Sequence, residues 1–546
     1  MVKQRTAKVS QRTRKPDATA AQPATRPSRT AARNAGKWST GVWAAALVGC
    51  FAAAGVGDAN ASGIAAARFG GEHGHPTTDN PTAIYYNPAG IALSKGTHIF
   101  VDGTIALRWA GYERPAAGPD DVAAGGNPVQ NNQETLGLAP GANDGKASLF
   151  NAIASPFLGV SSDFGTDFIY GGLSVSFPFG GSAVWDKNSV YNGNDEYPGA
   201  VDGQQRWYSI DGSIRSMYIT GALAFNIRKI GLSIGLSGSA IRSNVTTLRA
   251  RNADGTDDLV TVNSDGTVAR DADGNTSLKE GRSLVDVNGW QGGFGIGLVY
   301  DVLKQGKYFI GASYTSQPNI TGGMTLKGKL QNALATSQPD QSDVEFTQSL
   351  PDIFRLGFRI RPTDKYELRI FGDYTRWSVS DRQCLINVSS KNEHTCDFGD
   401  GENALDDPES YGAGTGEEDN PAAGVVQHLP RFWKDAGGVR IGGSYWFIPE
   451  LEGYLGAGYD SSAVPLETLD PALMDMNKFS ISAGVRWQII KHLAMAFTAT
   501  ELIYLRTSTK GKSALNRFPA PTRQPSADGV YTQFLQLFNI SADISF

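Results

Sequence analysis

The end of the chain alternates regularly between apolar and polar residues. From Phe538 to the end of the chain every second residue is apolar, namely Phe538, Ile540, Ala542, Ile544 and Phe546, and the residues between them are polar. Because successive side chains of a β-strand point to opposite faces, the segment predicts a strand that is apolar on one side and polar on the other. A final strand of this kind that ends on an aromatic residue is typical of a transmembrane barrel, with lipid on one side and a polar lumen on the other.

The same alternation recurs along the chain. Arg355, Arg359 and Arg361 alternate with a continuous Phe/Leu/Ile face, which suits a wall between lipid and a polar lumen. A soluble sheet with one face in water is the alternative. Tight turns and long polar stretches also alternate. We therefore predict an all-β fold, a transmembrane antiparallel β-barrel of about fourteen strands. The strands are expected near 97–112, 147–162, 167–177, 211–228, 230–248, 283–302, 306–328, 344–361, 365–380, 427–447, 451–460, 477–489, 492–507 and 530–546.

The N-terminal segment 1–61 has the pattern of an export signal. A long basic stretch comes first, the apolar stretch 38–57 follows, and Ala59-Asn60-Ala61 supplies small residues for cleavage before Ser62. Two alternatives stay open. The apolar stretch could be a membrane anchor, or Cys50 could be the acylated cysteine of a lipoprotein.

Removing this signal makes the chain more acidic. The precursor has 49 Lys and Arg against 54 Asp and Glu, and loss of ten basic and two acidic residues leaves a formal charge of −13. This charge does not indicate a nucleic-acid partner. The mature sequence has no uncharged apolar run long enough for a helix to cross a bilayer. An acidic, Gly-rich and aromatic-rich sequence of this kind fits a barrel with polar loops and a polar lumen.

Residues 62–95 precede the first predicted strand and do not alternate. They are rich in Gly, Ala and Pro and contain the pair Tyr85-Tyr86. A segment in this position either hangs in the periplasm or folds into the lumen, and its small residues and aromatic pair favour a plug. We therefore predict a hatch over 62–95 and the barrel, with long extracellular loops, over 96–546.

Two cysteines remain after the signal. Cys384 and Cys396 lie in the polar segment 382–426, and in an oxidising compartment such a pair predicts one loop disulfide. Two unpaired thiols are the alternative. Whether the 382–426 loop also has a binding role of its own stays open.

Several short motifs occur in a fixed order along the chain. They are Asn87-Pro88-Ala89, Ser176 to Gly180, Leu350-Pro351-Asp352, Tyr374 to Ser378, and the block from Tyr459 to Pro465 with the strand that follows it. In this order they resemble the FadL/TodX family of outer-membrane transporters of long-chain fatty acids and aromatic hydrocarbons. Ala463 departs from the family pattern, which usually has a proline at that position.

The resemblance implies a transport mechanism without covalent chemistry. Asn87, Pro88 and Ala89 would form the core of the hatch. Gly171, Gly172 and Pro178 would weaken pairing in the strand over 167–180 and open the barrel wall sideways. An ordinary strand end beside a loop is the alternative. The ligand would be a hydrophobic small molecule held by apolar contacts, each buried CH₂ contributing about 0.8 kcal/mol.

The remaining expectations concern partners and other functions. We expect a monomer in the outer membrane that contacts membrane lipid, with no cofactor, no metal and no catalytic residues. One alternative is a general diffusion porin, which should lack a plug. The other is an outer-membrane lipid hydrolase, because Gly231 to Gly235 matches G-x-S-x-G. Ser233 lies in mid-alternation, however, and the motif requires a strand-to-helix elbow. The sequence does not say which hydrophobic ligand is carried.

Overall fold

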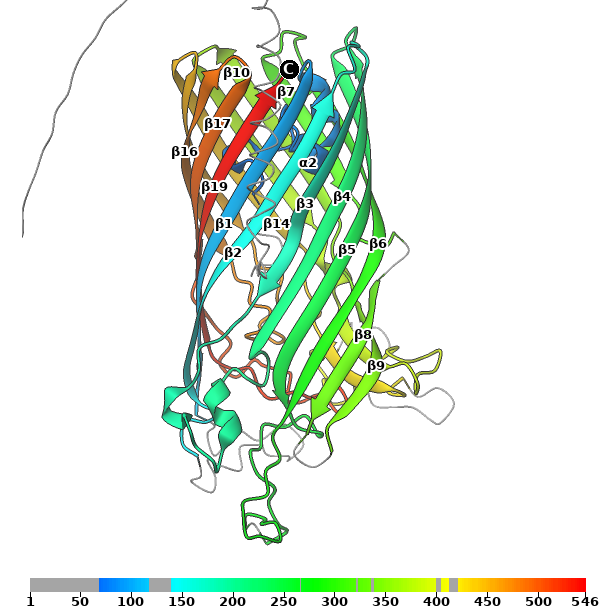
Figure 1. Cartoon of the computed structure of the whole chain (residues 1–546), viewed down its shortest axis with the longest axis vertical. Coiled ribbons are helices and arrows are strands. Elements are labelled where there is room, and N and C mark those ends of the chain that lie inside the picture. The colour runs from blue at the N-terminus through cyan, green and yellow to red at the C-terminus, as the bar shows by residue number, and fades with distance from the viewer. Residues whose placement is uncertain are drawn as a thin grey trace, which may run out of the picture. The chain divides into compact units, whose positions relative to one another are not determined.

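The computed structural model describes residues 68–116, 139–265, 267–320, 323–334, 338–398, 404–411 and 421–546. The export signal 1–61 and Cys50 lie outside these residues. The described strands form one antiparallel sheet that closes on itself, because β1 (Thr97–Arg114) pairs with both β2 (Gly145–Ser162) and β19 (Val530–Ser545) (Figure 1). The structure therefore confirms the predicted all-β barrel.

The sheet has nineteen strands at fourteen positions around the barrel, because some positions hold two short strands one after the other. We call each position a lane. β7 and β8 share one lane because both pair with β6, and the same holds for β9 with β10, β11 with β12, β13 with β14, and β17 with β18. The remaining strands are β3 (Ile169–Ser182), β4 (Asp211–Ile227), β5 (Leu232–Arg251), β6 (Gly281–Asp301), β7 (Tyr308–Thr315), β8 (Met324–Ala333), β9 (Asp340–Gln348), β10 (Ile353–Thr363), β11 (Tyr366–Thr375), β12 (Arg382–Asn387), β13 (Val425–Pro430), β14 (Ala436–Ile448), β15 (Leu451–Asp460), β16 (Lys478–Ile490), β17 (Leu493–Tyr504) and β18 (Thr507–Ser508).

The outer wall is apolar and the inner wall is largely small or polar. On β6 the outward side chains from Trp290 to Tyr300 are exposed and apolar, whereas the inward neighbours include Gly295, Gly297 and the buried Val299. An outward apolar band bounded by aromatic residues is what a lipid bilayer requires of a barrel. The alternation that predicted the strands thus has its cause in two different solvents, lipid outside and polar groups inside.

The two ends of the barrel differ in the length of their connections. Four residues join β4 to β5 and two join β10 to β11, whereas 183–210, 252–280 and 505–529 are long connections at the other end. The C-terminal residue lies at the end with the short turns (Figure 1). Short periplasmic turns and long extracellular loops are the usual arrangement of outer-membrane barrels, so we assign the ends in this way.

Four of the lanes are interrupted in mid-course. The sequence predicts single strands over 306–328, 344–361, 365–380 and 427–447, but each of these lanes holds two strands with an irregular segment between them. The fifth divided lane, predicted as one strand over 492–507, breaks only near its end, between β17 and the two-residue β18. Pro318 and Pro351 lie in two of the breaks. Because proline has no N–H to donate, it disrupts a ladder of backbone hydrogen bonds.

Candidate functional site

The segment before β1 folds into the lumen. It contains the short helices η1 (Gly71–His73), α2 (Ala83–Tyr86) and η2 (Pro88–Leu93), and it lies against β3, β4, β5, β6, β15 and β17. Phe69, Ala83 and Ala89 are completely buried. We call the described residues 68–95 the hatch. The plug expected from the sequence is therefore present inside the barrel.

Asn87 fastens the hatch to the barrel wall. Its Nδ2 donates to the carbonyl oxygen of Pro76 at 2.7 Å and to that of Leu298 on β6 at 2.9 Å. Its Oδ1 accepts from the backbone N–H of Ala89 at 3.1 Å and so caps η2, which begins at Pro88. Proline is suited to this first helical position because its fixed φ matches the helix and no N–H is needed there.

Glycines in the wall let the hatch approach the strands closely. A Cβ at Gly297 would lie 1.9 Å from Oδ1 of Asn87, and one at Gly235 would lie 2.2 Å from the backbone nitrogen of Ala89. Both distances are far below van der Waals contact, so a side chain at either position would displace the hatch. Gly235 belongs to the G-x-S-x-G match, and Ser233 lies in a regularly paired strand. The motif therefore has a packing explanation.

Charged groups also join the hatch to the lumenal wall. Arg359 on β10 forms an ion pair with Asp79 at 2.6 Å, and Glu452 on β15 accepts a hydrogen bond from the His73 ring at 3.0 Å. The guanidinium of Arg355 lies 4.8 Å from the ring centre of Tyr85. Two of the three arginines that predicted a polar lumen thus contact the hatch.

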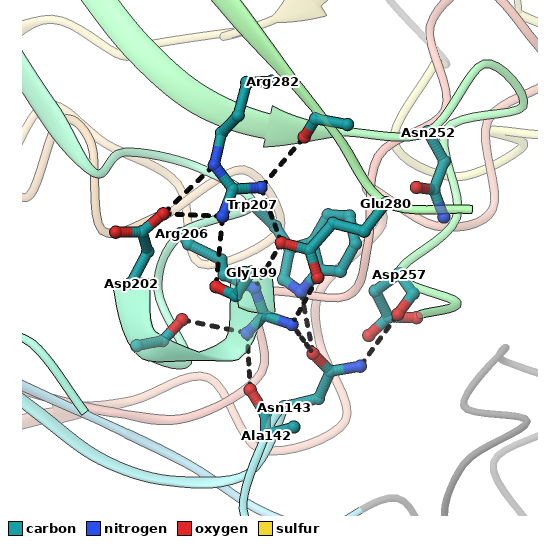
Figure 2. Close-up of polar contacts among 12 residues, drawn as sticks. Ala142, Asn143, Gly199, Asp202, Arg206, Trp207, Asn252, Asp257, Glu280 and Arg282 are labelled. Atoms are coloured by element: carbon teal, nitrogen blue, oxygen red, sulfur yellow. Dashed lines mark hydrogen bonds and ion pairs between the residues drawn. The ribbon is translucent and has the colours of Figure 1, made fainter. Parts of the chain in front are cut away.

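The extracellular loops close the other end of the barrel through a buried polar network. Figure 2 shows Arg206 at its centre. The Arg206 guanidinium donates two hydrogen bonds to the Glu280 carboxylate, both at 2.9 Å, and one to Oδ1 of Asn143 at 2.8 Å. Trp207 donates to the same Asn143 oxygen at 2.9 Å. Asn143, Arg206 and Glu280 come from three different loops, and we call this assembly the loop cap.

The acidic groups of the loop cap are held in their ionised form. Burial alone would raise the pKa of Glu280, but the adjacent guanidinium groups of Arg206 and Arg282 outweigh it and lower the pKa below its ordinary value. Asp202 follows the same pattern, since burial is outweighed by Lys187 and Arg282 and its pKa is lowered. The network therefore depends on two carboxylates staying charged.

A central cavity of about 250 Å³ lies between the hatch and the loop cap. The hatch contributes Tyr85 and Tyr86, and a loop contributes Tyr208. The apolar part of the lining includes Phe346, Ile353, Trp377, Leu385, Leu429, Trp433 and Met474. Such a concave and mostly apolar space is typical of a small-molecule site.

Three buried arginines, Arg108, Arg249 and Arg355, line this cavity without a carboxylate partner among the described residues; Arg355 donates to the hydroxyl of Thr315 at 2.9 Å. Arg108 donates to Gln533 at 2.7 Å and to the carbonyl oxygen of Ser182 at 3.0 Å. Arg249 donates to Gln524 at 3.3 Å, and its Nε has no hydrogen-bond partner. Arg249 and Gln524 also border a second cavity of about 180 Å³ on the extracellular side. Arg249 thus lines both the central cavity and the second cavity on the extracellular side.

The barrel wall is incomplete between β2 and β3. The two strands pair from Ser162 opposite Gly171 as far as Phe157 opposite Ser176, and no pairing follows. Toward β4 the register of β3 shifts between Ser176 and Phe179. Gly171 and Gly172 are regularly paired on both sides, contrary to the expectation that they weaken the ladder. Among the three candidate residues, only Pro178 lies at the interruption. Its lack of an N–H accounts for a missing hydrogen bond in the ladder at this point.

The structure joins Cys384 on β12 and Cys396 in a disulfide, with their Cα atoms 6.2 Å apart. Arg382 donates to the carbonyl oxygen of Cys396. The bridge therefore ties a long loop to the end of the barrel wall. In the described part of the chain, no group of three or more His, Cys, Asp or Glu side chains could hold a metal ion. No described helix is both long and apolar enough to cross a membrane.

Sequence reasoning located the hatch but missed the cavity residues. Trp377 stood in one of the recognised motifs, but nothing in its strand pattern marked it as a lumenal residue. The breaks between paired strands bring Trp377 and Trp433 to the cavity, 4.9 Å apart between ring centres. Arg108 occupies a polar position of the predicted strand 97–112, and Arg249 falls just outside the predicted strand 230–248, so the sequence marked neither as a cavity residue. A basic residue on the lumenal side of a strand is the only signal that could have selected them.

Fold and site together define an outer-membrane barrel with a lumenal plug and an internal apolar cavity. The family model of the outer membrane transport proteins OMPP1/FadL/TodX matches residues 43–546. The chain belongs to this family, whose members transport hydrophobic compounds. It is therefore an outer-membrane protein.

Solved structures show the same fold. A FadL homologue from Pseudomonas aeruginosa has 18% identity and a TM-score of 0.63, with 90% of this chain and 99% of that chain covered. The toluene transporter TbuX of Ralstonia pickettii has 16% identity and a TM-score of 0.52, with the same coverage. The toluene transporter TodX of P. putida has 13% identity and a TM-score of 0.52, again over 90% and 99%. No curated protein sequence matches the chain.

Proposed function

We propose that this protein takes hydrophobic molecules from the extracellular side into the central cavity and releases them sideways between β2 and β3. The observation that carries the proposal is the position of the cavity beside the incomplete wall. Gly181, Ser182 and Ala183 line the cavity, and they belong to or directly follow the end of β3 that is not paired with β2. A molecule in the cavity is therefore separated from the membrane by side chains rather than by a hydrogen-bonded ladder.

The lining favours a ligand with a long apolar part and an acidic group. Apolar side chains supply the larger part of the cavity, and each CH₂ removed from water contributes about 0.8 kcal/mol. Arg108, Arg249 and Arg355 add three buried cations without a carboxylate partner among the described residues. A buried cation is stabilised by an anionic partner. A fatty acid meets both requirements, whereas a neutral hydrocarbon such as toluene leaves the arginines unpaired.

The hatch argues against a general diffusion porin. A porin of this size needs an open aqueous lumen, and here Phe69, Asn87 and Ala89 are completely buried within the barrel. Water and ions would have to pass the hatch, whereas a ligand that leaves through the wall above it would not. The sideways route therefore accounts for a lumen that is plugged permanently.

A disulfide staple across the gap tests this route. Asn151 on β2 donates from Nδ2 to Oγ of Ser182 at 3.3 Å, so the two side chains face each other where backbone pairing is missing. The double variant Asn151→Cys/Ser182→Cys should form a bridge that closes the gap. With the bridge oxidised, we expect fatty-acid uptake by proteoliposomes to fall to background while fatty-acid binding persists. Reduction should restore uptake.

The matched control places the same staple where the wall is continuous. Ser216 on β4 and Ser243 on β5 have hydroxyl oxygens 2.8 Å apart in regularly paired strands, and Ser216→Cys/Ser243→Cys should leave uptake unchanged. The unsubstituted protein, treated with the same reductant, controls for loss of the Cys384–Cys396 bridge. Full uptake by the oxidised Asn151→Cys/Ser182→Cys variant would show that the ligand leaves elsewhere.

A further inference from the structure

The outer wall carries basic side chains at the level where its apolar band ends on the extracellular side. On β6 the outward apolar residues run from Tyr300 to Trp290, and the next outward residues toward the long loops are Asn288 and Asp286. Exposed tryptophan marks the boundary between acyl chains and head groups in barrels of this kind. Trp290 therefore places that boundary on this part of the wall.

The basic residues lie at this boundary on neighbouring strands. Arg242 on β5 is paired in register with Trp290. One step further toward the loops, Arg215 on β4, Asn244 on β5, Asn288 on β6 and Lys327 on β8 form a continuous row. These strands stand side by side in the wall (Figure 1). Since adjacent strands are about 4.8 Å apart, the long side chains of Arg242 and Lys327 reach a common area of surface, whereas the guanidinium of Arg215 lies over the ring of Phe177 on β3, 4.2 Å from its centre.

The guanidinium of Arg242 is held in place by neighbouring side chains, but none of the described carboxylates neutralises its charge. Its guanidinium lies 5.5 Å from the ring centre of Trp290, and Nη2 donates to Oδ1 of Asn288 at 3.0 Å. No carboxylate lies within ion-pair distance of Arg242 among the residues that the structure describes. The ring and the amide fix the orientation of the guanidinium, and the other N–H groups of its planar fork are available to an oxyanion.

The neighbouring acidic groups already have partners. Asp343 pairs with Lys329 at 2.7 Å, and Asp286 accepts from the hydroxyl of Thr246 at 3.3 Å. Lys327 pairs with Glu345 at 3.1 Å, but its side chain is 75% exposed. An ion pair with such an exposed lysine is weakly held. The Lys327 ammonium is therefore free to turn toward a second anion on its solvent side.

We propose that Arg242 and Lys327, with Trp290 as a hydrophobic platform, form a binding site for the phosphate groups of a phosphorylated glycolipid in the outer leaflet. Such a lipid carries its phosphates where acyl chains meet sugar, which is the level of Trp290. Arginine matches phosphate with a bidentate geometry, and cations at an anionic lipid surface add to one another. The site lies on the outside of the wall and is independent of the transport route.

The test uses the full-length mature protein in a non-ionic detergent. Native mass spectrometry measures binding of a bisphosphorylated glycolipid, its dephosphorylated form, and phosphatidylglycerol as a simple anionic lipid. We expect the dephosphorylated form to bind about thirtyfold more weakly, the change that two cations at a lipid surface produce. The variant Arg242→Gln/Lys327→Gln should lose the same factor for the phosphorylated form alone. Heat-modifiable mobility on a gel verifies that each variant is folded.

The chain offers a control on the lumenal side of the wall. Arg361 lies 4.1 Å from the ring centre of Trp446 near the periplasmic end, so Arg361→Gln removes an arginine–tryptophan pair that does not face the outer leaflet. It should leave glycolipid binding unchanged. Equal affinity for the phosphorylated and dephosphorylated glycolipids would overturn the proposal. So would an equal loss in Arg361→Gln, or phosphatidylglycerol that binds as tightly as the bisphosphorylated lipid.

Discussion

The hatch and the loop cap close the same lumen from opposite ends, but they are held by different partners. The hatch is bound to the strands of the wall, through Asn87 to Leu298, Asp79 to Arg359 and His73 to Glu452. The loop cap is held mainly by its own residues, because Asn143, Arg206 and Glu280 come from three loops that leave the barrel between different strands. Its links to the wall include Arg282 at the start of β6, which pairs with Glu280 and Asp202, and Ala250 on β5, whose N–H donates to the carbonyl oxygen of Arg206. One closure is therefore inserted into the lumen and bound to the wall, and the other is formed mainly by contacts among loops.

This difference determines what each closure does to the barrel when it fails. The wall is a closed ladder whose backbone groups satisfy one another, so it does not need the hatch to stay folded. The loop cap fails by local unfolding of loops, which leaves the strands below intact. We therefore expect the hatch to control passage through the lumen and the loop cap to control access to the central cavity.

Removal of the hatch has the largest expected effect. Deleting residues 62–90 takes away Asn87, Asp79 and the whole of α2, and leaves the lumen lined by small and polar wall residues. Ion conductance in planar bilayers should rise to that of an open pore, and uptake of hydrophobic ligand should fall. Unchanged conductance together with unchanged uptake would contradict the role assigned to the hatch.

A single substitution on one strand reproduces part of this effect with its own control. Gly297→Val places a side chain where a Cβ alone would lie 1.9 Å from Asn87, whereas nothing lies within 4 Å of a Cβ at Gly292. Both glycines are on β6. Gly297→Val should raise conductance and Gly292→Val should not. Equal conductance of the two variants would show that the hatch does not need this close approach.

The wall could be predicted from the sequence because one physical rule governs it. Lipid on one side and polar groups on the other impose a period of two, and Phe354, Leu356 and Phe358 report it without knowledge of any partner. Residues 62–95 lack this alternation, and its absence indicated the position of the hatch. Strand boundaries were close to those observed, except in the four interrupted lanes.

The interior could not be predicted in this way because its contacts join distant parts of the chain. Asn143, Arg206 and Glu280 lie in separate polar loops, and polarity alone does not distinguish them from exposed residues. The need for Gly297 is visible only when Asn87 is placed against it. The position of Arg108 and Arg249 at the same cavity depends likewise on which strands meet across the lumen. Local periodicity carries no information about such pairs.

Loss of Arg206 tests the loop cap and should have the second-largest effect. Arg206→Met removes the hydrogen bonds to Glu280 and Asn143, and breaking a buried ion pair from one side costs about 3–5 kcal/mol. Because the Arg206 guanidinium donates hydrogen bonds only to loop residues among those described, the loss should appear as faster hydrogen exchange and proteolysis in 199–207 and 276–280, with the melting of the barrel unchanged. Arg270→Met, an exposed arginine of the same loop region, is the control and should change neither. A lower melting temperature of the barrel would show that the loop cap also supports the wall.

The loop cap should also open in acid, which distinguishes it from a purely apolar closure. Because the folded-state pKa values of Glu280 and Asp202 are lowered, their contribution to stability is complete above the unfolded pKa of about 4.3 for Glu. It is lost as the pH falls through the lower folded value. Hydrogen exchange of 199–207, corrected for its intrinsic pH dependence, should show constant protection from pH 7 to pH 5 and loss of protection below about pH 4. Protection that stays constant down to the lowest pH at which the barrel remains folded would contradict the ionic account.

Asn87→Ala should produce the smallest of these effects, and it tests whether the hatch is held by donors or by packing. The substitution leaves the carbonyl oxygens of Pro76 and Leu298 without this donor and the N–H of Ala89 without its acceptor. A buried polar group left unpaired costs about 1–3 kcal/mol. Since the barrel ladder is untouched, we expect unchanged melting and a conductance between those of the unsubstituted protein and the hatch deletion. Asn87→Asp separates the two kinds of contact, because its carboxylate still accepts from Ala89 but cannot donate to either carbonyl. If Asn87→Asp conducts like the unsubstituted protein, the donors are dispensable and the hatch is held by packing against the glycines of the wall.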